Sequence, residues 1–138
     1  MNSEMVRVVV TTAVAESNLQ KIRAVSGRIK ADQLSPLILG ERKGDRSKKD
    51  ELDALFGEAE VVYGWIHHFP KNLLSRGPRL KWIQTMSAGV DRLPEDLRRS
   101  QVRVVNASGL HGTPMAEVVE PRPSAICVMT RLIFCLPL

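Results

Sequence analysis

Residues 80–91 read Leu-Lys-Trp-Ile-Gln-Thr-Met-Ser-Ala-Gly-Val-Asp, and the interpretation of the whole chain starts from this stretch. A strand-like run at 81–85 passes without a linker into the small residues of Ser87–Asp91. Successive amides in a glycine-containing turn at the carboxyl end of a strand can converge on one point and bind a carboxylate or phosphate. An ordinary strand-to-helix turn is the alternative, because glycine occurs in turns of every kind.

Short apolar runs alternate with amphipathic segments along the chain. Strands are expected at Val6–Val10, at either Ile29–Leu34 or Leu37–Leu39, at Ala59–Trp65, at Trp82–Gln84 and at Val102–Val105. Helices are expected at Ala15–Ser26, Glu51–Phe56, Pro70–Ser75 and Leu93–Arg99, with a polar loop at Gly40–Asp50. This alternation predicts the α/β fold class, with a doubly wound parallel five-stranded sheet.

Ligands of such sheets bind at the carboxyl ends of the strands. The expected ends are Thr11–Thr12, Gly64–Trp65, Met86–Val90 and Asn106–Gly112. The sequence therefore predicts a ligand site at this edge, and three of the ends, those at Gly64–Trp65, Met86–Val90 and Asn106–Gly112, carry candidate residues.

Composition excludes several classes of function. The chain has 138 residues, of which 43% are hydrophobic, and a formal net charge of +5. Its densest charged segment, Glu41–Asp50, mixes acids with bases, and aromatic residues make up only 4%, which argues against a nucleic-acid surface. A signal peptide and an apolar run long enough to span a membrane are both absent from the sequence, so a cytoplasmic location is expected.

The adjacent His67 and His68 are not expected to bind a metal. Neighbouring residues of a strand point to opposite faces, and the sequence offers no third ligand at a useful spacing. Cys127 and Cys135 have no paired spacing and are expected to be reduced.

Several motifs in a fixed order carry a family resemblance. They are Pro-x-Leu-Lys-x-Ile from Pro78, Ser-Ala-Gly-Val-Asp from Ser87, a short valine strand, Asn-Ala-Ser-Gly from Asn106, and then Ala116-Glu117. Together they resemble the substrate, or catalytic, domain of the NAD(P)-dependent D-isomer-specific 2-hydroxyacid dehydrogenases, which is a flavodoxin-like domain. The resemblance covers about Val6 to Val119.

The resemblance implies substrate-binding residues. The amides of Ala88, Gly89 and Val90 would hold the substrate carboxylate. Trp65 would lie near the substrate side chain, with a core or hinge aromatic as the alternative. His111 stands where several relatives have an Asn that contacts the substrate, with a surface-loop histidine as the alternative. No catalytic, cofactor-binding or metal-binding residue is expected in this chain.

The cofactor half of such enzymes is not recognisable in the sequence. The family implies NAD or NADP, held by a Rossmann domain with a Gly-x-Gly-x-x-Gly turn, but the 138 residues contain neither that turn nor the Arg, Glu and His that act on the substrate. Pro121 and Pro123 should end the helix near Val119. The expected domains are therefore 1–119, the substrate domain, and 120–138, a poorly packed tail that suggests a frameshift, a mis-spliced end or a truncation.

Two functions are compatible with these observations. The first is the N-terminal half of an oxidoreductase that transfers a hydride between NAD(P)H and a small 2-hydroxy or 2-oxo acid, such as glyoxylate or hydroxypyruvate, and that is inactive alone. Relatives are usually homodimers, but the dimerising region is largely absent here. The second is a non-catalytic α/β module that binds a small anion or a partner. A Gly-x-Gly-x-x-Gly turn in another reading frame of the DNA beyond Val119 would favour the first.

Overall fold

The fold is known from a computed structural model that describes residues 5–109. Residues up to Asn106 belong to one compact unit, and residues 107–138 to a second unit of which only 107–109 are described. The expectations for His111 and for the tail 120–138 lie outside the described residues.

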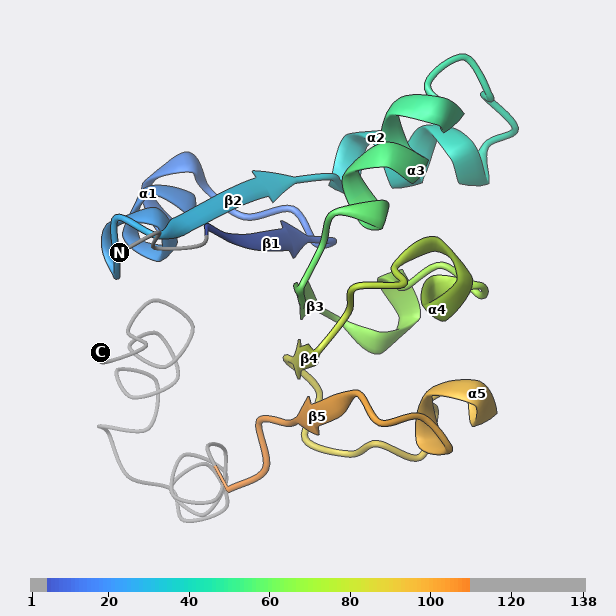
Figure 1. Ribbon diagram of the computed structural model, residues 1–138. Coiled ribbons are helices and arrows are strands. Elements are labelled where there is room, and N and C mark those ends of the chain that lie inside the picture. The colour runs from blue at the N-terminus through green and yellow to red at the C-terminus, as the bar shows by residue number, and fades with distance from the viewer. Residues whose placement is uncertain (1–4, 110–138) are drawn as a thin grey trace, which may run out of the picture. The chain divides into compact units, whose positions relative to one another are not determined.

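A parallel sheet forms the centre of the first unit (Figure 1). Its strands are β1 (Val6–Val10), β2 (Ile29–Gln33), β3 (Val61–Gly64), β4 (Trp82–Thr85) and β5 (Arg103–Val105). They lie in the order β2-β1-β3-β4-β5, and every neighbouring pair is parallel. This is the flavodoxin-like strand order, so the predicted five-stranded parallel sheet of the α/β class is confirmed.

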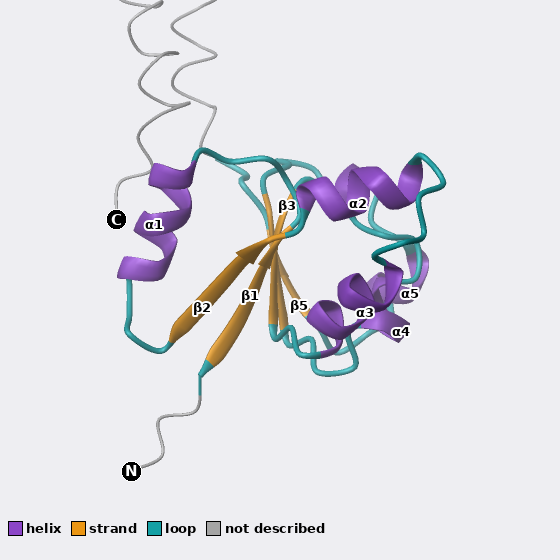
Figure 2. Ribbon diagram, turned by 90° about the horizontal axis from the view of Figure 1, so that it is seen from above, coloured by secondary structure: helices purple, strands orange, loops and turns teal. Residues whose placement is uncertain are grey.

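Helices lie on both faces of the sheet (Figure 2). They are α1 (Glu16–Ala24), α2 (Ser35–Arg42), α3 (Lys49–Gly57), α4 (Leu73–Arg76) and α5 (Glu95–Arg98), with a 3-10 helix at Ile66–His68. Figure 2 shows α1 on one side of the sheet and the other helices on the opposite side. Within residues 5–109, no helix is long and apolar enough to cross a membrane.

Two hydrophobic layers follow from the alternation of side chains along the strands. On β1, Val9 belongs to the larger layer, while Val8 and Val10 belong to the smaller layer with Leu19 of α1. The larger layer contains most of the large side chains that are fully buried in the unit, among them Leu52, Phe56, Val62, Leu73, Ile83 and Leu97. Both faces of the sheet thus carry a core, as a parallel sheet requires.

The predicted bounds of one loop are wrong at both ends. The segment Gly40–Asp50 was expected to be a loop, but α2 continues to Arg42 and α3 begins at Lys49. Pro36 explains the difference, because proline fits the first turn of a helix, where its missing N–H has no partner to lose. The second strand is accordingly the earlier of the two candidate segments, Ile29–Gln33.

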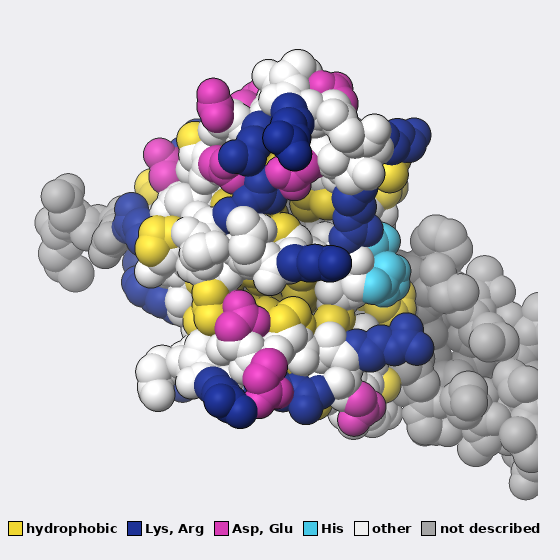
Figure 3. Space-filling model, turned by 90° about the vertical axis from the view of Figure 1, so that its right-hand side faces the viewer, with side chains coloured by type: hydrophobic (Ala, Val, Ile, Leu, Met, Phe, Trp, Pro, Cys, Tyr) yellow, Lys and Arg dark blue, Asp and Glu magenta, His cyan; other side chains and the backbone are white. Residues whose placement is uncertain are grey.

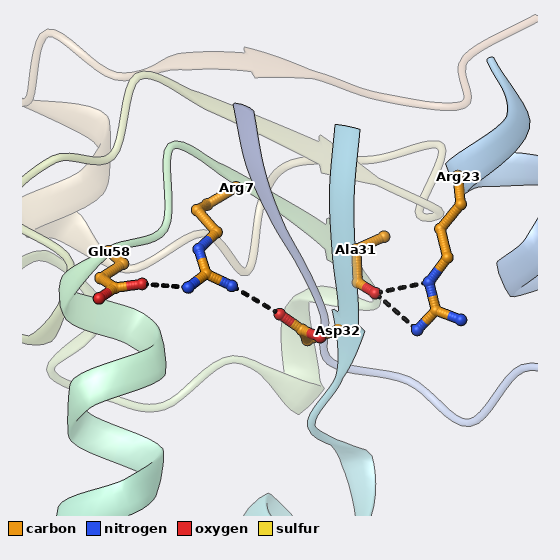
Figure 4. Close-up of polar contacts among 5 residues, drawn as sticks. All are labelled: Arg7, Arg23, Ala31, Asp32 and Glu58. Atoms are coloured by element: carbon orange, nitrogen blue, oxygen red, sulfur yellow. Dashed lines mark hydrogen bonds and ion pairs between the residues drawn. The ribbon is translucent and has the colours of Figure 1, made fainter. Parts of the chain in front are cut away.

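Polar contacts tie β1 and β2 to two helices (Figure 4). The guanidinium of Arg7 on β1 contacts Asp32 of β2 at 3.2 Å and Glu58 at the end of α3. Arg23 of α1 donates from Nε and Nη2 to the Ala31 carbonyl oxygen at 3.0 and 2.8 Å. Partly exposed ion pairs such as those of Arg7 contribute little to the free energy of folding. The hydrophobic layers stabilise the helices, and the polar contacts orient them.

Gly64 allows β1 and β3 to approach closely where they end. Its φ is 151°, and a Cβ placed on it would lie 2.2 Å from Thr11 Oγ1. That hydroxyl donates to the Tyr63 carbonyl oxygen at 3.3 Å, and Thr11 is buried. A side chain at position 64 would therefore force the ends of two central strands apart.

We expect Gly64→Ala to lower the free energy of unfolding by about 2–4 kcal/mol, because it adds a steric clash to an unfavourable backbone conformation. Gly27→Ala is the matched control, since a Cβ at Gly27 meets no atom within 4 Å. Urea denaturation of the two variants and the parent measures the difference. Equal stability of both variants would show that Gly64 is not a close-approach position.

Candidate functional site

Strand ends of the unit gather at one edge of the sheet. Gly64, the last residue of β3, pairs with Thr85, the last residue of β4. Gln84 pairs with Val105, so Asn106 emerges from β5 next to the end of β4. The segment Ser87–Val90 follows β4 directly, at the carboxyl end that the sequence predicts.

Three hydrogen bonds hold the loop after β4. The Met86 amide donates to the Gly64 carbonyl oxygen at 3.0 Å, which continues the pairing with β3. The Ser87 amide donates to Thr85 Oγ1 at 3.1 Å, and Thr85 is fully buried. From β5, Asn106 Nδ2 donates to the Ala88 carbonyl oxygen at 2.9 Å. The loop is thus fixed from its own strand and from both neighbouring strands.

The next three amides are available to a ligand. Ala88, Gly89 and Val90 are all exposed, and within residues 5–109 their N–H groups donate no hydrogen bond. Consecutive exposed amides at the end of a buried strand can bind an anion through partial positive charges that cost no side-chain entropy. The arrangement is therefore suited to a carboxylate.

Gly89 does not have an unusual backbone angle, and one flexible side chain lies near it. Its φ is not positive, and a Cβ on it would lie 2.9 Å from Asp91 Oδ2. The carboxylate of Asp91 therefore lies near the three amides. This negative charge opposes anion binding, so the site is a weak one by itself.

Trp65 lies at the same edge of the sheet. It follows Gly64 at the end of β3, is half-buried, and its ring centroid lies 6.0 Å from that of His67. Its place beside the end of β4 is consistent with a wall of the site.

The two histidines do not lie on a strand as was expected. They belong to the 3-10 helix Ile66–His68, and their rings meet edge-on with centroids 4.3 Å apart. Burial, together with the nearby charges of His67 and Arg42, lowers the pKa of His68 below its usual value. His68 is therefore neutral at neutral pH and adds no positive charge. No cluster of three or more metal-binding side chains occurs among residues 5–109.

Sequence analysis gave no role to two residues that shape the loop. Thr85 and Asn106 each hold a backbone group of the loop through a side chain. Thr85 carries a polar group at the very end of an apolar strand, and Asn106 does the same one strand along. A polar residue at the carboxyl end of an apolar strand is thus the sequence feature that identifies both residues as candidates.

A family model supports this assignment of the chain. Residues 8–131 match the model described as "D-isomer specific 2-hydroxyacid dehydrogenase, catalytic domain". The match extends beyond Val119. No curated protein matches the sequence.

Solved structures of similar fold come from several bacteria. A D-isomer specific 2-hydroxyacid dehydrogenase family protein from Aeromonas salmonicida has a TM-score of 0.57 at 20% identity, over 95% of this chain and 36% of that one. Phosphoglycerate dehydrogenase from Lactobacillus plantarum has 0.54 at 25%, over 91% and 34%. D-Lactate dehydrogenase from Aquifex aeolicus, complexed with NAD and lactic acid, has 0.51 at 16%, over 96% and 39%. The chain thus spans little more than a third of the length of these proteins.

A groove of about 700 Å³, which none of Ala88, Gly89 and Val90 lines, lies between α2, α4 and the 3-10 helix. Figure 3 shows this face of the unit, with Lys and Arg side chains around hydrophobic ones. Arg76 in the groove is only 7% exposed and is bound twice by Glu41, with Nη1 to Oε2 at 2.9 Å. Its Nε also lies 2.7 Å from Asp53 Oδ1. This cation is therefore committed to the fold and is not available to a ligand.

We expect the stability contributed by Glu41 to depend on pH. Its hydrogen bond with Arg76 lowers the pKa of the carboxyl below the usual 4.5. A lowered pKa stabilises the fold fully above the unfolded-state pKa, and the effect is lost as the pH falls through the folded-state pKa. Glu41→Gln should thus cost about 1–2 kcal/mol at neutral pH and little in acid below the folded-state pKa of Glu41.

The control for this measurement is Glu16→Gln, which breaks an exposed pair with Arg23. It should change stability by less than about 0.5 kcal/mol at any pH. Thermal or urea unfolding between neutral and acidic pH makes the comparison. An equal loss for Glu41→Gln at both ends of the range would contradict an ionic role for Glu41.

Proposed function

This chain belongs to the D-isomer specific 2-hydroxyacid dehydrogenase family, and from that premise we propose that the amides of Ala88, Gly89 and Val90 bind the carboxylate of a small 2-hydroxy or 2-oxo acid. One observation carries the proposal: these three exposed amides donate no hydrogen bond within residues 5–109, and they directly follow the buried end of β4. A carboxylate, which every such acid has, is the group that a row of neutral N–H donors recognises.

The remaining site residues would select among acids. The amides recognise a group that all substrates share, so discrimination falls to groups that meet the substrate side chain. Trp65, at the neighbouring strand end, supplies a large flat surface that favours small acids of the glyoxylate or hydroxypyruvate type. His111 can donate a hydrogen bond and can also become charged near neutrality.

The proposed reaction of the whole enzyme is hydride transfer between a nicotinamide cofactor and the acid. Two proteins of similar fold, 3-phosphoglycerate dehydrogenase of Entamoeba histolytica and D-lactate dehydrogenase of Aquifex aeolicus, were solved with NAD bound, which supports NAD or its phosphorylated form here. The 138 residues contain no Gly-x-Gly-x-x-Gly turn, however, and so do not fit the cofactor. What these residues contribute is the binding and orientation of the substrate carboxylate.

The isolated site should bind weakly. It is open to water, its donors are uncharged, and the carboxylate of Asp91 lies close to Gly89. An affinity in the millimolar range, equivalent to about 4 kcal/mol, is therefore expected for pyruvate or glyoxylate.

We expect Gly89→Pro to abolish pyruvate binding and Gly89→Ala to retain it. Proline removes the N–H of residue 89, whereas alanine keeps it, and the added Cβ meets only the flexible end of Asp91. Titration of the 138-residue chain with pyruvate, followed by ¹H–¹⁵N NMR, measures both. Saturable shifts at residues 88–90 in the parent support the site, and their absence would refute the proposed function.

We also expect residues 1–138 alone to show no turnover. Positioning of the reactants accounts for about 7–11 kcal/mol of barrier lowering in well-oriented reactions, and this sequence has no recognisable element to hold a nicotinamide. Glyoxylate, hydroxypyruvate or pyruvate with NADH, and then NADPH, should leave the nicotinamide absorbance unchanged. Turnover that persists through further purification and is lost in Gly89→Pro would overturn this expectation.

A further inference from the structure

We propose that Asn106 is a positioning residue for the carboxylate site, because its side-chain amide fixes the peptide between Ala88 and Gly89 and so aims the Gly89 N–H. This inference rests on the proposed function, since it concerns how the same site is built. It assigns a task to the first residue of the Asn-Ala-Ser-Gly motif, which has no individual role in the resemblance.

The strand register brings Asn106 to the loop. Because β4 and β5 pair in parallel with Gln84 opposite Val105, residue 106 leaves the sheet beside Thr85. Its Nδ2 then reaches the Ala88 carbonyl oxygen at 2.9 Å, a normal hydrogen-bond length. The contact joins residues 18 apart in the sequence, so it depends on the sheet and not on the local turn.

A hydrogen bond to this carbonyl also orients the next amide. A trans peptide group is planar, and its C=O and N–H point in opposite directions. Holding the Ala88 oxygen toward Asn106 therefore points the Gly89 N–H away from Asn106. Gly89 is exposed and has no side chain to cover that N–H. The direction of the donor is thus set from the neighbouring strand.

Neighbouring peptides of the loop are fixed in other ways. The Ser87 N–H is held by Thr85 Oγ1, and the Val90 carbonyl oxygen accepts from the Leu93 amide at 3.0 Å. Between these anchors, within residues 5–109, the contact from Asn106 is the one side-chain hydrogen bond to the Ala88–Gly89 peptide. Its loss should leave the loop in place but let this one peptide rotate.

Asparagine suits the task because it is a neutral donor. An aspartate would lack the N–H, and it would place a second negative charge near an anion that already faces Asp91. A lysine would add an attractive charge, but it would hold the carbonyl with a mobile point donor and not with a fixed planar amide.

The test measures pyruvate affinity of the 138-residue chain by ¹H–¹⁵N NMR for four forms of the protein. Asn106→Leu has a similar shape but no donor, and it should raise the Kd by about three- to tenfold, the worth of one hydrogen bond. Asn106→His places a ring N–H near the original donor and should restore binding to within about twofold. Ser100→Ala, which removes a similar side-chain contact with the Leu97 carbonyl oxygen just before β5, should bind as the parent does.

A second readout needs no ligand. In the ¹³C,¹⁵N-labelled parent, a scalar coupling across the hydrogen bond should connect Asn106 Nδ2 with the Ala88 carbonyl carbon. In Asn106→Leu, the Gly89 amide signal should move while the signals of β1 and β3 stay, which a general loss of structure would not produce. Should Asn106→Leu fail to fold, Asn106→Ser, whose hydroxyl is too short to reach Ala88, replaces it.

The outcomes separate this inference from the proposed function. Parent binding at residues 88–90 with unchanged affinity in Asn106→Leu would overturn the role of Asn106 and leave the carboxylate site intact. Absence of parent binding at these residues would refute the proposed function and with it the positioning role. Weaker binding in Asn106→Leu that Asn106→His restores, with the coupling present in the parent, would support both.

Discussion

The pairing of β4 between β3 and β5 is the constraint on which the candidate site depends. Because all three strands are parallel and in register, Gly64, Thr85 and Asn106 end their strands side by side. Each then contributes one contact to the loop that follows β4: a carbonyl oxygen, a hydroxyl group and a side-chain amide. A shift of β4 by one residue would turn Ile83 away from the core and remove the contacts of the loop with Gly64 and Asn106. The hydrophobic core and the site are therefore specified by the same register.

Burial and exposure are divided sharply along β4 and its loop. Ile83 and Thr85 are 0% exposed, whereas Ala88 and the two residues after it are exposed. An amide without a protein partner would be costly inside the core, but in water it is satisfied by solvent and can exchange that water for a ligand oxygen. The site can thus keep unpaired donors without destabilising the fold. The conformational entropy that is lost in ordering the loop is offset by burial of the strand before it and by the hydrogen bonds that hold the loop.

The sheet was more predictable from the sequence than the contacts within the site. Runs such as Val6–Val10 report burial on both faces, and their alternation with helices predicts parallel order. Pro36 was harder to place, because the same residue can interrupt a strand or begin a helix, and only packing of Ile38 decides for α2. The strand expected at Ala59–Trp65 ends at Gly64, whose backbone angle no pattern of hydrophobicity reveals, and a 3-10 helix with His67 follows it. Contacts such as that of Asn106 with Ala88 depend on register between distant segments, and periodicity alone does not say which residues of two such segments lie opposite each other.

The proposed carboxylate site consists of neutral backbone amides, although the chain has a net charge of +5. Several cations near the sheet already have partners: Arg76 binds Glu41 and Asp53, Lys81 binds Glu60, and Arg98 donates to the carbonyl oxygen of Leu93. None of these charges is free to meet a substrate, and the charge closest to Gly89 is the carboxylate of Asp91. Neutral N–H donors in contact with water add little to the free energy of binding, because each one replaces a hydrogen bond that the ligand already makes to water. Such donors select ligands mainly by the geometry of the hydrogen bonds. We therefore propose that these amides orient the acid more than they attract it.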